Sequence, residues 1–216
     1  MASVGAPADL LSHPPSRRGE PTWEIAYSYP SQGEWTETTY LSVAGKGQLI
    51  ELSEGCLEFL PMPTLLHQRI VRYLQRLLEV YVLAHAAGEV FFAPLPVRLW
   101  AGKYREPDVV YLRPERIGPP RSQPLGADLA IEVVSEGGDS RERDLVTKRQ
   151  EYAEARISEY WIVDPQELLI TVLSLDGQTY RVHGEFKPGQ QATSVLLPGF
   201  SVAVDAVFTS GEGSSS

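Results

Sequence analysis

The chain has 216 residues, of which 43% are hydrophobic, so we expect one substantial domain with a packed core. Its single cysteine, Cys56, excludes a disulfide framework within the chain and fits a reducing compartment. The net charge of −9 argues against a surface that coats nucleic acid broadly. The first residues lack a secretory-signal pattern, and no window approaches about 18 uninterrupted apolar residues, so we predict a cytoplasmic protein without a membrane span.

The two ends of the chain differ in composition from the part between them. Residues 1–22 are rich in Pro, Ser, Ala and Gly and show no hydrophobic period, which predicts a flexible leader. Residues 209–216, TSGEGSSS, predict a disordered tail for the same reason. Residues 23–208 are therefore expected to form a single domain.

The first half of this domain is predicted to contain a hairpin and a long helix. The stretch GQLIELSEGCLEFLP (47–61) predicts two short strands joined by a turn at residues 53–55. Residues 64–88 predict a helix that Thr64 caps and Gly88 ends. The apolar stripe of this helix, at spacings of three and four, consists of Ile70, Leu74, Leu77, Leu78, Tyr81 and Val82.

The second half alternates strands with one further helix, expected at about 143–156. A hairpin is expected to turn at Asp176–Gly177. The order of elements predicts an α/β or α+β fold with helices packed on the faces of a sheet. Two strands that flank the second helix are expected to form a parallel crossover unit. The predicted strands are 89–100 (irregular at its two prolines), 106–112, 128–135, 159–165 and 168–184, and residues 198–208 close the domain.

Glu132 lies in the middle of DLAIEVVS (128–135), a strand that the sequence predicts to be buried on both faces. Alternation along the strand places Ala130, Glu132 and Val134 on one face. A buried carboxylate needs a cation, a metal ion or several hydrogen-bond donors. A structural ion pair, or an edge-facing glutamate that reaches water, is the alternative to a functional site.

Three other residues each have a functional and a structural interpretation. Asp108 opens a predicted strand after Pro107, although it would also suit a simple turn cap. Lys148 shares a helix side with apolar neighbours three and four residues away, although an Asp144–Lys148 surface pair would explain it equally. His67, near the start of the long helix, would suit capping or packing as well as chemistry.

Taken together, these residues predict a metal site. Asp108 and Glu132, on neighbouring strands, could hold one divalent cation, and carboxylate oxygens favour Mg²⁺ or Mn²⁺. Lys148 would then offset the charge of a phosphate, or orient the attacking water and help to deprotonate it. These groups predict metal-assisted phosphodiester hydrolysis.

Two stretches of the sequence resemble known nuclease motifs. Pro107–Asp108 followed by Glu132–Val133–Val134 resembles the Pro-Asp … (Asp/Glu)-X-Lys pattern of the PD-(D/E)XK nuclease superfamily, with Val134 where the lysine is expected. The run DLAIEVVSEGGDSRERDLVTKRQEYAEARISEYWIVDP and the upstream GQLIELSEGCLEFLPMPTLLHQRIV resemble the Uma-type restriction endonuclease family. This resemblance covers roughly residues 40–205.

The resemblance implies a fold, an activity and a set of site residues. The fold would be a restriction-endonuclease-like α/β fold, with a mixed β-sheet flanked by helices and an N-terminal β-hairpin extension. The activity would be that of an Mg²⁺- or Mn²⁺-dependent DNA endonuclease. In RDLVTK, Lys148 occupies the position of the helix lysine that replaces the strand lysine in this family. The implied catalytic residues are Asp108, Glu132 and Lys148, the first two as metal ligands, with His67 and Glu58 as supporting groups; Glu51 or Glu58 would be a further ligand or a solvated strand residue.

The expected partners are DNA and a second copy of the chain. We expect Arg141, Arg143 and Arg149 to contact phosphates. Arg69, Arg72 and Arg76 share one helix face, which would either meet a nucleic-acid backbone or, as we favour, be solvated. Because the chain has no room for a separate recognition domain, a homodimer would supply a composite surface. The rival interpretation is a catalytically silent binding or assembly module with the same fold.

Overall fold

The computed structural model describes residues 16–18, 28–135, 137 and 141–212. The leader expected at 1–22 therefore lies outside the described residues apart from 16–18, and the division into leader, domain and tail stays a prediction. No helix in the described part is long and apolar enough to span a membrane.

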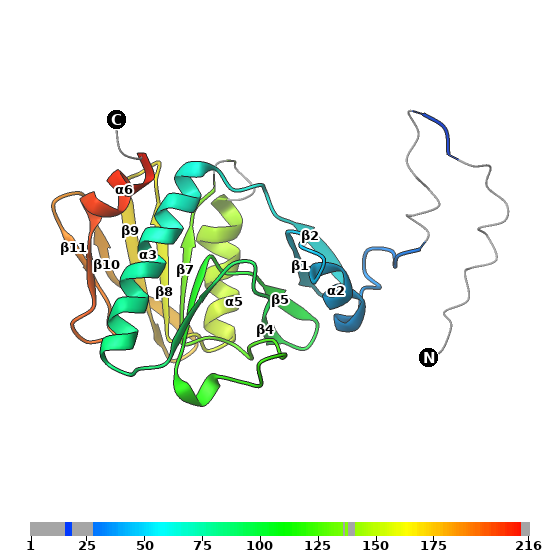
Figure 1. Cartoon of the computed structure of the whole chain (residues 1–216), viewed down its shortest axis with the longest axis horizontal. Coiled ribbons are helices and arrows are strands. Elements are labelled where there is room, and N and C mark those ends of the chain that lie inside the picture. Colours follow the sequence, from blue (N-terminus) through cyan, green and yellow to red (C-terminus); the bar gives the residue numbers. More distant parts are fainter. Residues whose placement is uncertain (1–15, 19–27, 136, 138–140, 213–216) are drawn as a thin grey trace.

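A six-stranded mixed sheet forms the centre of the structure, in the order β10-β9-β8-β7-β6-β3 (Figure 1). Only β7 and β8 are parallel, as the predicted crossover requires, and the other neighbours are antiparallel. The strands are β3 Glu89–Phe92, β6 Val109–Leu112, β7 Leu129–Val133, β8 Glu159–Asp164, β9 Leu169–Asp176 and β10 Thr179–Phe186.

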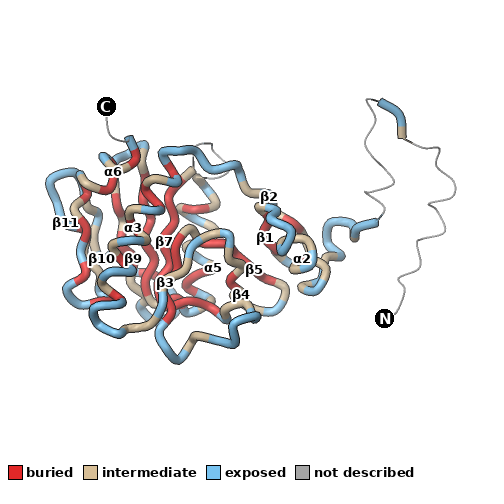
Figure 2. The backbone as a smooth tube through the Cα atoms, in the orientation of Figure 1, coloured by how far each residue is buried: buried red, intermediate tan, exposed pale blue. Residues whose placement is uncertain are grey.

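Helices cover both faces of this sheet (Figure 1). Helix α3, Leu65–Ala84, and helix α6, Val204–Glu212, pack on one face, where the apolar stripe of α3 meets the odd-numbered residues of β7. The π-helical segment η3, Arg143–Thr147, continues into α5, Lys148–Glu154, on the other face. Figure 2 shows that the central strands are buried along their length. Alternation therefore directs Glu132 toward α5, as the strand pattern predicted.

A second, four-stranded sheet extends the fold at its N-terminal side, in the order β2-β1-β5-β4. The predicted hairpin is present and turns at Glu54–Gly55, both with positive φ. Helix α2, Glu37–Ala44, covers this sheet through Tyr40, which is fully buried. The strands are β1 Ile50–Ser53, β2 Cys56–Phe59, β4 Val97–Trp100 and β5 Lys103–Arg105; a separate pair consists of β11 Gln191–Thr193 and β12 Ser201–Ala203.

Two boundaries differ from the sequence-based expectation. The strand expected at 89–100 divides at its prolines into β3 and β4, which belong to different sheets, because proline cannot continue a hydrogen-bonded ladder. Residues 209–212, expected to belong to the tail, are instead helical, because α6 continues to Glu212 and packs on α3 through Val207 and Phe208. Residues 213–216 lie outside the described residues. The predicted α/β class, with a mixed sheet, flanking helices and an N-terminal hairpin, is confirmed.

Candidate functional site

Five of the predicted site residues, His67, Asp108, Glu132, Arg143 and Lys148, line one cavity of about 290 Å³. Its wall combines the first turn of α3, the approach to β6, the end of β7, and the helix formed by η3 and α5. The spatial convergence that the sequence predicted is therefore present. The remaining lining residues are Leu49, Leu60, Pro61, Pro63, Gln68, Ala93, Pro94, Glu106, Val133, Ser135 and Asp144.

Lys148 and Glu132, which both line this cavity, form a buried ion pair. The Lys148 Nζ lies 2.8 Å from Glu132 Oε1, and both residues are 3% exposed. Tyr152 Oη donates to the same oxygen over 2.5 Å. Asp144 Oδ1 and Glu51 Oε1 lie 3.2 and 3.9 Å from Lys148 Nζ. Asp144 is also 3% exposed, so the interpretation of Asp144–Lys148 as a surface pair is wrong.

The charge states follow from this geometry. Burial disfavours the charge on Lys148, but Glu132, Asp144 and Glu51 outweigh it and raise the pKa of Lys148 above its ordinary value. Burial raises the pKa of the Glu132 carboxyl, and the nearby Asp108 and Asp144 add to this effect while Lys148 opposes it. The three carboxylates thus favour the charged form of Lys148, while burial disfavours the charged form of Glu132.

Asp108 reaches the end of β7 and the start of α3. Its Oδ2 accepts a hydrogen bond from the Val133 backbone N–H over 2.8 Å and lies 3.2 Å from His67 Nε2. Thr64 caps α3 by accepting from the His67 backbone N–H, which fixes the histidine in the first turn. Burial lowers the pKa of His67, but the bond to Asp108 outweighs burial and raises that pKa overall. Asp108 thus links strand and helix and does not cap its own turn.

Each of the two predicted ligands keeps one oxygen without a partner. Glu132 accepts both of its hydrogen bonds at Oε1, and Asp108 uses only Oδ2, when partners are sought among the described residues. Carboxylate oxygens of this kind suit Mg²⁺ or Mn²⁺, so the residues fit a divalent ion. Within the described ranges, no three His, Cys, Asp or Glu side chains are gathered as a complete metal site. Two carboxylates would therefore leave most of the coordination shell to water.

Glu106 is a site residue that sequence reasoning missed. It is 4% exposed, lines the cavity, and its Oε2 has no hydrogen-bond partner. Burial, reinforced by the charge of Glu51, raises the pKa of Glu106 to about 8. The only signal in the sequence was an acidic residue directly before Pro107–Asp108.

Glu58 lies outside the cavity wall. Its carboxylate binds Arg105, whose fully buried guanidinium also binds Glu51 and Glu151. Glu51 accepts from the Glu106 backbone N–H as well, over 2.8 Å. The two upstream glutamates therefore bind Arg105 within the four-stranded sheet, Arg105 joins that sheet to α5 through Glu151, and Glu51 is the one that approaches Lys148.

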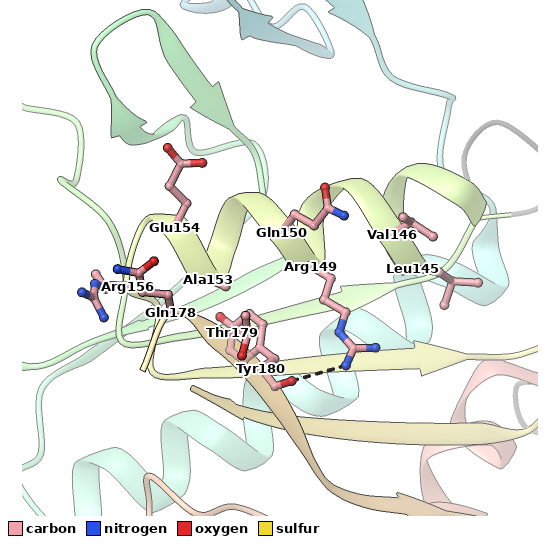
Figure 3. Close-up of a pocket in the computed structure, with 10 residues that line it drawn as sticks. All are labelled: Leu145, Val146, Arg149, Gln150, Ala153, Glu154, Arg156, Gln178, Thr179 and Tyr180. Carbon is pink, nitrogen blue, oxygen red and sulfur yellow. Dashed lines mark hydrogen bonds between the residues drawn. The ribbon is translucent and has the colours of Figure 1, made fainter. Parts of the chain in front are cut away.

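Of the three arginines expected to contact phosphate, one lines the cavity. Arg143 does so; its buried Nε has no hydrogen-bond partner among the described residues and lies 3.6 Å from Asp144 Oδ1. Arg141 is bound to both oxygens of Asp164, at 3.0 and 2.7 Å. Arg149 points toward the Tyr180 carbonyl, 3.4 Å away, in a larger hollow of about 820 Å³ between α5 and the β9–β10 hairpin (Figure 3). Consecutive helix residues differ by about 100° in direction, so Arg149 cannot share the inward direction of Lys148.

Comparisons with known proteins agree with this arrangement. Residues 37–205 match the family described as "Uma2: Putative restriction endonuclease". A crystal structure from Anabaena variabilis, described as "a putative nuclease belonging to DUF820", superimposes with a TM-score of 0.66 at 16% identity, over 82% of this chain and 99% of that chain. At this identity the likeness shows a shared fold alone. No curated protein matches the chain. Because the family match covers most of the chain and the whole candidate site from His67 to Lys148, this chain belongs to the Uma2 family of restriction-endonuclease-like proteins.

Proposed function

We propose that this chain is a divalent-metal-dependent endonuclease that hydrolyses phosphodiester bonds of DNA. Its membership of a nuclease family gives the reaction class. The observation that carries the proposal is the single cavity in which two carboxylates with spare oxygens lie beside a buried ammonium group. That combination suits a phosphate, because it supplies ligands for a cation and a fixed positive charge at one place.

The residues divide into direct and supporting roles. Asp108 and Glu132 would hold Mg²⁺ or Mn²⁺, which lowers the pKa of a bound water and offsets charge on the phosphoryl oxygens. Lys148, 2.8 Å from Glu132 Oε1, would orient or activate the attacking water and offset charge on the phosphate. His67 contacts Asp108 Oδ2 and Tyr152 donates to Glu132 Oε1, so each fixes the carboxylate oxygen that would not bind the cation. Arg143 is the cavity arginine available for a phosphate contact.

Nicking of a supercoiled plasmid tests this proposal. We expect nicking with Mg²⁺ or Mn²⁺ and none with EDTA. Asp108→Asn, Glu132→Gln and Lys148→Met should each lower the initial rate at least about 100-fold, because each removes a group fixed toward the developing charge. Glu115→Gln is the matched control, since Glu115 is exposed, does not line the cavity and should keep the parent rate.

Two results would contradict the proposal. A folded protein that leaves DNA and RNA intact with both cations would favour the catalytically silent module. Cleavage of RNA alone would keep the hydrolytic site and overturn the DNA substrate. A cytoplasmic homodimer, with the β9–β10 hairpin or the N-terminal strands as contact, stays a prediction that sedimentation and cell fractionation can test.

A further inference from the structure

A second hollow, of about 430 Å³, adjoins the candidate catalytic cavity. Gln68 lines both spaces, so the two are neighbours along the first turns of α3. We call this second space the α3 groove. Its lining residues are Leu65, Gln68, Arg69, Val71, Arg72 and Gln75 of α3 and Phe92 of β3.

Two exposed apolar side chains line the α3 groove. Phe92 is 58% exposed and Leu65 is 74% exposed. Phe92 ends the edge strand β3, where it pairs with Val109, and the next residue donates its backbone N–H to the Asp108 carbonyl over 3.1 Å. The backbone that carries the Phe92 side chain is thus fixed beside the backbone of a proposed metal ligand, while the side chain itself is more than half exposed. Single exposed apolar residues are common, but two in one groove beside a candidate active site indicate a ligand.

The same groove contains one uncommitted cation. Arg72 is exposed and forms no hydrogen bond or ion pair with any residue that the structure describes. Arg69, by contrast, binds the carbonyls of Gly211 and Glu212 at the end of α6. Leu65, Gln68 and Arg72 follow spacings of three and four, and Gln75 continues the series, so they share one helix face. This face runs for about 15 Å away from the catalytic cavity.

We propose that the α3 groove binds an unpaired nucleotide next to the phosphodiester that is cleaved, with its base stacked on Phe92 and a phosphate bound by Arg72. This inference rests on the proposed function, and it names single-stranded segments of DNA as the preferred substrate. An aromatic platform with an adjacent cation is the means by which proteins bind unpaired bases. Inside a duplex both faces of each base are covered by neighbouring bases, so the internal base pairs of a duplex cannot stack on the ring. Gln68 and Gln75 add amide groups that can bind base edges or phosphates.

Binding measured without cleavage tests the role of Phe92. We would titrate the protein, with Ca²⁺ in place of Mg²⁺, into a fluorescent duplex with a single-stranded overhang and into the blunt duplex, and check both probes for integrity afterwards. The overhang should bind at least about fivefold more tightly, and Phe92→Ala should remove this preference, while Phe92→Trp should keep it. Phe59→Ala is the matched control, because Phe59 is 72% exposed on β2 and does not line the groove.

Salt dependence tests Arg72 separately. Arg72→Gln should weaken binding and lower the slope of log affinity against log salt by about 0.7, the value for one phosphate contact on a single strand. Arg76→Gln, one turn further along the same exposed side and outside the groove, should change neither. Both arginines are at the surface, so neither substitution should disturb folding.

Three outcomes separate this inference from the proposed function. If the parent protein nicks plasmid but binds both probes equally, with or without Phe92, the inference alone fails. If plasmid stays intact while Phe92→Ala still weakens overhang binding, hydrolysis fails and the groove stands as a nucleic-acid site. If Phe92→Ala instead converts a dimer to a monomer in sedimentation without changing either affinity, the groove is a contact between copies and the inference is overturned.

Discussion

Two glutamates on neighbouring parallel strands of the central sheet are both buried, yet they are bound in opposite ways. Glu132 on β7 is 3% exposed and Glu159 on β8 is fully buried. Glu159 accepts four hydrogen bonds, two at each oxygen, from Trp161 Nε1 and Ser194 Oγ and from the backbone N–H groups of Val195 and Leu196. Glu132 accepts two, both at one oxygen, and one of them comes from a cation.

The difference shows that burial of a carboxylate does not by itself identify a functional site. Glu159 has used its whole capacity as an acceptor, so it fastens the segment before β12 to the sheet and has nothing left for a ligand. Glu132 has an unused oxygen and lies in a cavity wall beside Asp108, whose other oxygen is also unused. Unused acceptor capacity next to a cavity is therefore the feature that separates the candidate ligand from the structural residue.

The same substitution at both positions should give the largest contrast in stability. Glu159→Gln replaces one carboxylate oxygen with an NH₂ group, so the two buried donors that face this oxygen lose their acceptor. We expect the free energy of unfolding to fall by about 3 kcal/mol. Glu132→Gln keeps an acceptor for Tyr152 and leaves Lys148 with Asp144 and Glu51, so its change should stay under about 1 kcal/mol. Urea unfolding without metal measures both. Equal losses would mean that Glu132 is structural too.

Binding of a divalent cation should also distinguish the two glutamates, because it should depend on Glu132 and not on Glu159. At a cation concentration about 100 times its Kd, Mn²⁺ should add about 2.7 kcal/mol to the free energy of unfolding, because the ion binds the folded chain alone. Asp108→Asn and Glu132→Gln should lose most of this gain, whereas Glu159→Gln should retain it despite its lower starting stability. Thermal unfolding with Mn²⁺ and with EDTA gives the comparison. A gain that survives in Glu132→Gln would place the ion elsewhere.

The parts of the fold that the sequence predicted well depend on local signals. Thr64 and the apolar stripe specify α3 through residues within a few turns of each other. Alternation in β7 gives the direction of Glu132 from its immediate neighbours. The inward direction of Lys148 followed from apolar residues three and four positions away, and the structure confirms it.

The parts that were missed depend on contacts between distant segments. Glu51 and Glu106 meet because β1 pairs with β5, more than fifty residues later. The burial of Asp144 depends on the π-helical segment η3, whose altered period cannot be read from hydrophobic spacing. Arg141 is unavailable because Asp164, at the end of β8, binds it. None of these pairings leaves a local pattern in the sequence.

A third kind of buried carboxylate, paired with cations away from the cavity, should have a smaller effect on stability than Glu159, and one that depends on pH. Glu151 binds Arg105 through both oxygens, at 2.7 and 2.8 Å, and also contacts Lys103. Burial raises the pKa of Glu151, but the hydrogen bonds and charges of these two cations outweigh it and lower that pKa below the ordinary 4.5. Below pH 4.5 the unfolded chain therefore takes up a proton before the folded chain does, so this stabilisation is complete above pH 4.5 and is lost as pH falls through the lowered pKa.

Glu151→Gln should therefore cost about 1 kcal/mol at neutral pH, since Arg105 keeps Glu51 and Glu58 as partners. The difference from the parent chain should shrink as the pH falls below 4.5, because the parent then loses the same ion pairs by protonation. Urea unfolding across that range measures the difference. A difference that stays constant into the acid range would show that Glu151 acts through packing. A difference that vanishes would show that Glu151 stabilises the fold through its ion pairs, so that it belongs with Glu159 among the structural carboxylates and not with Glu132.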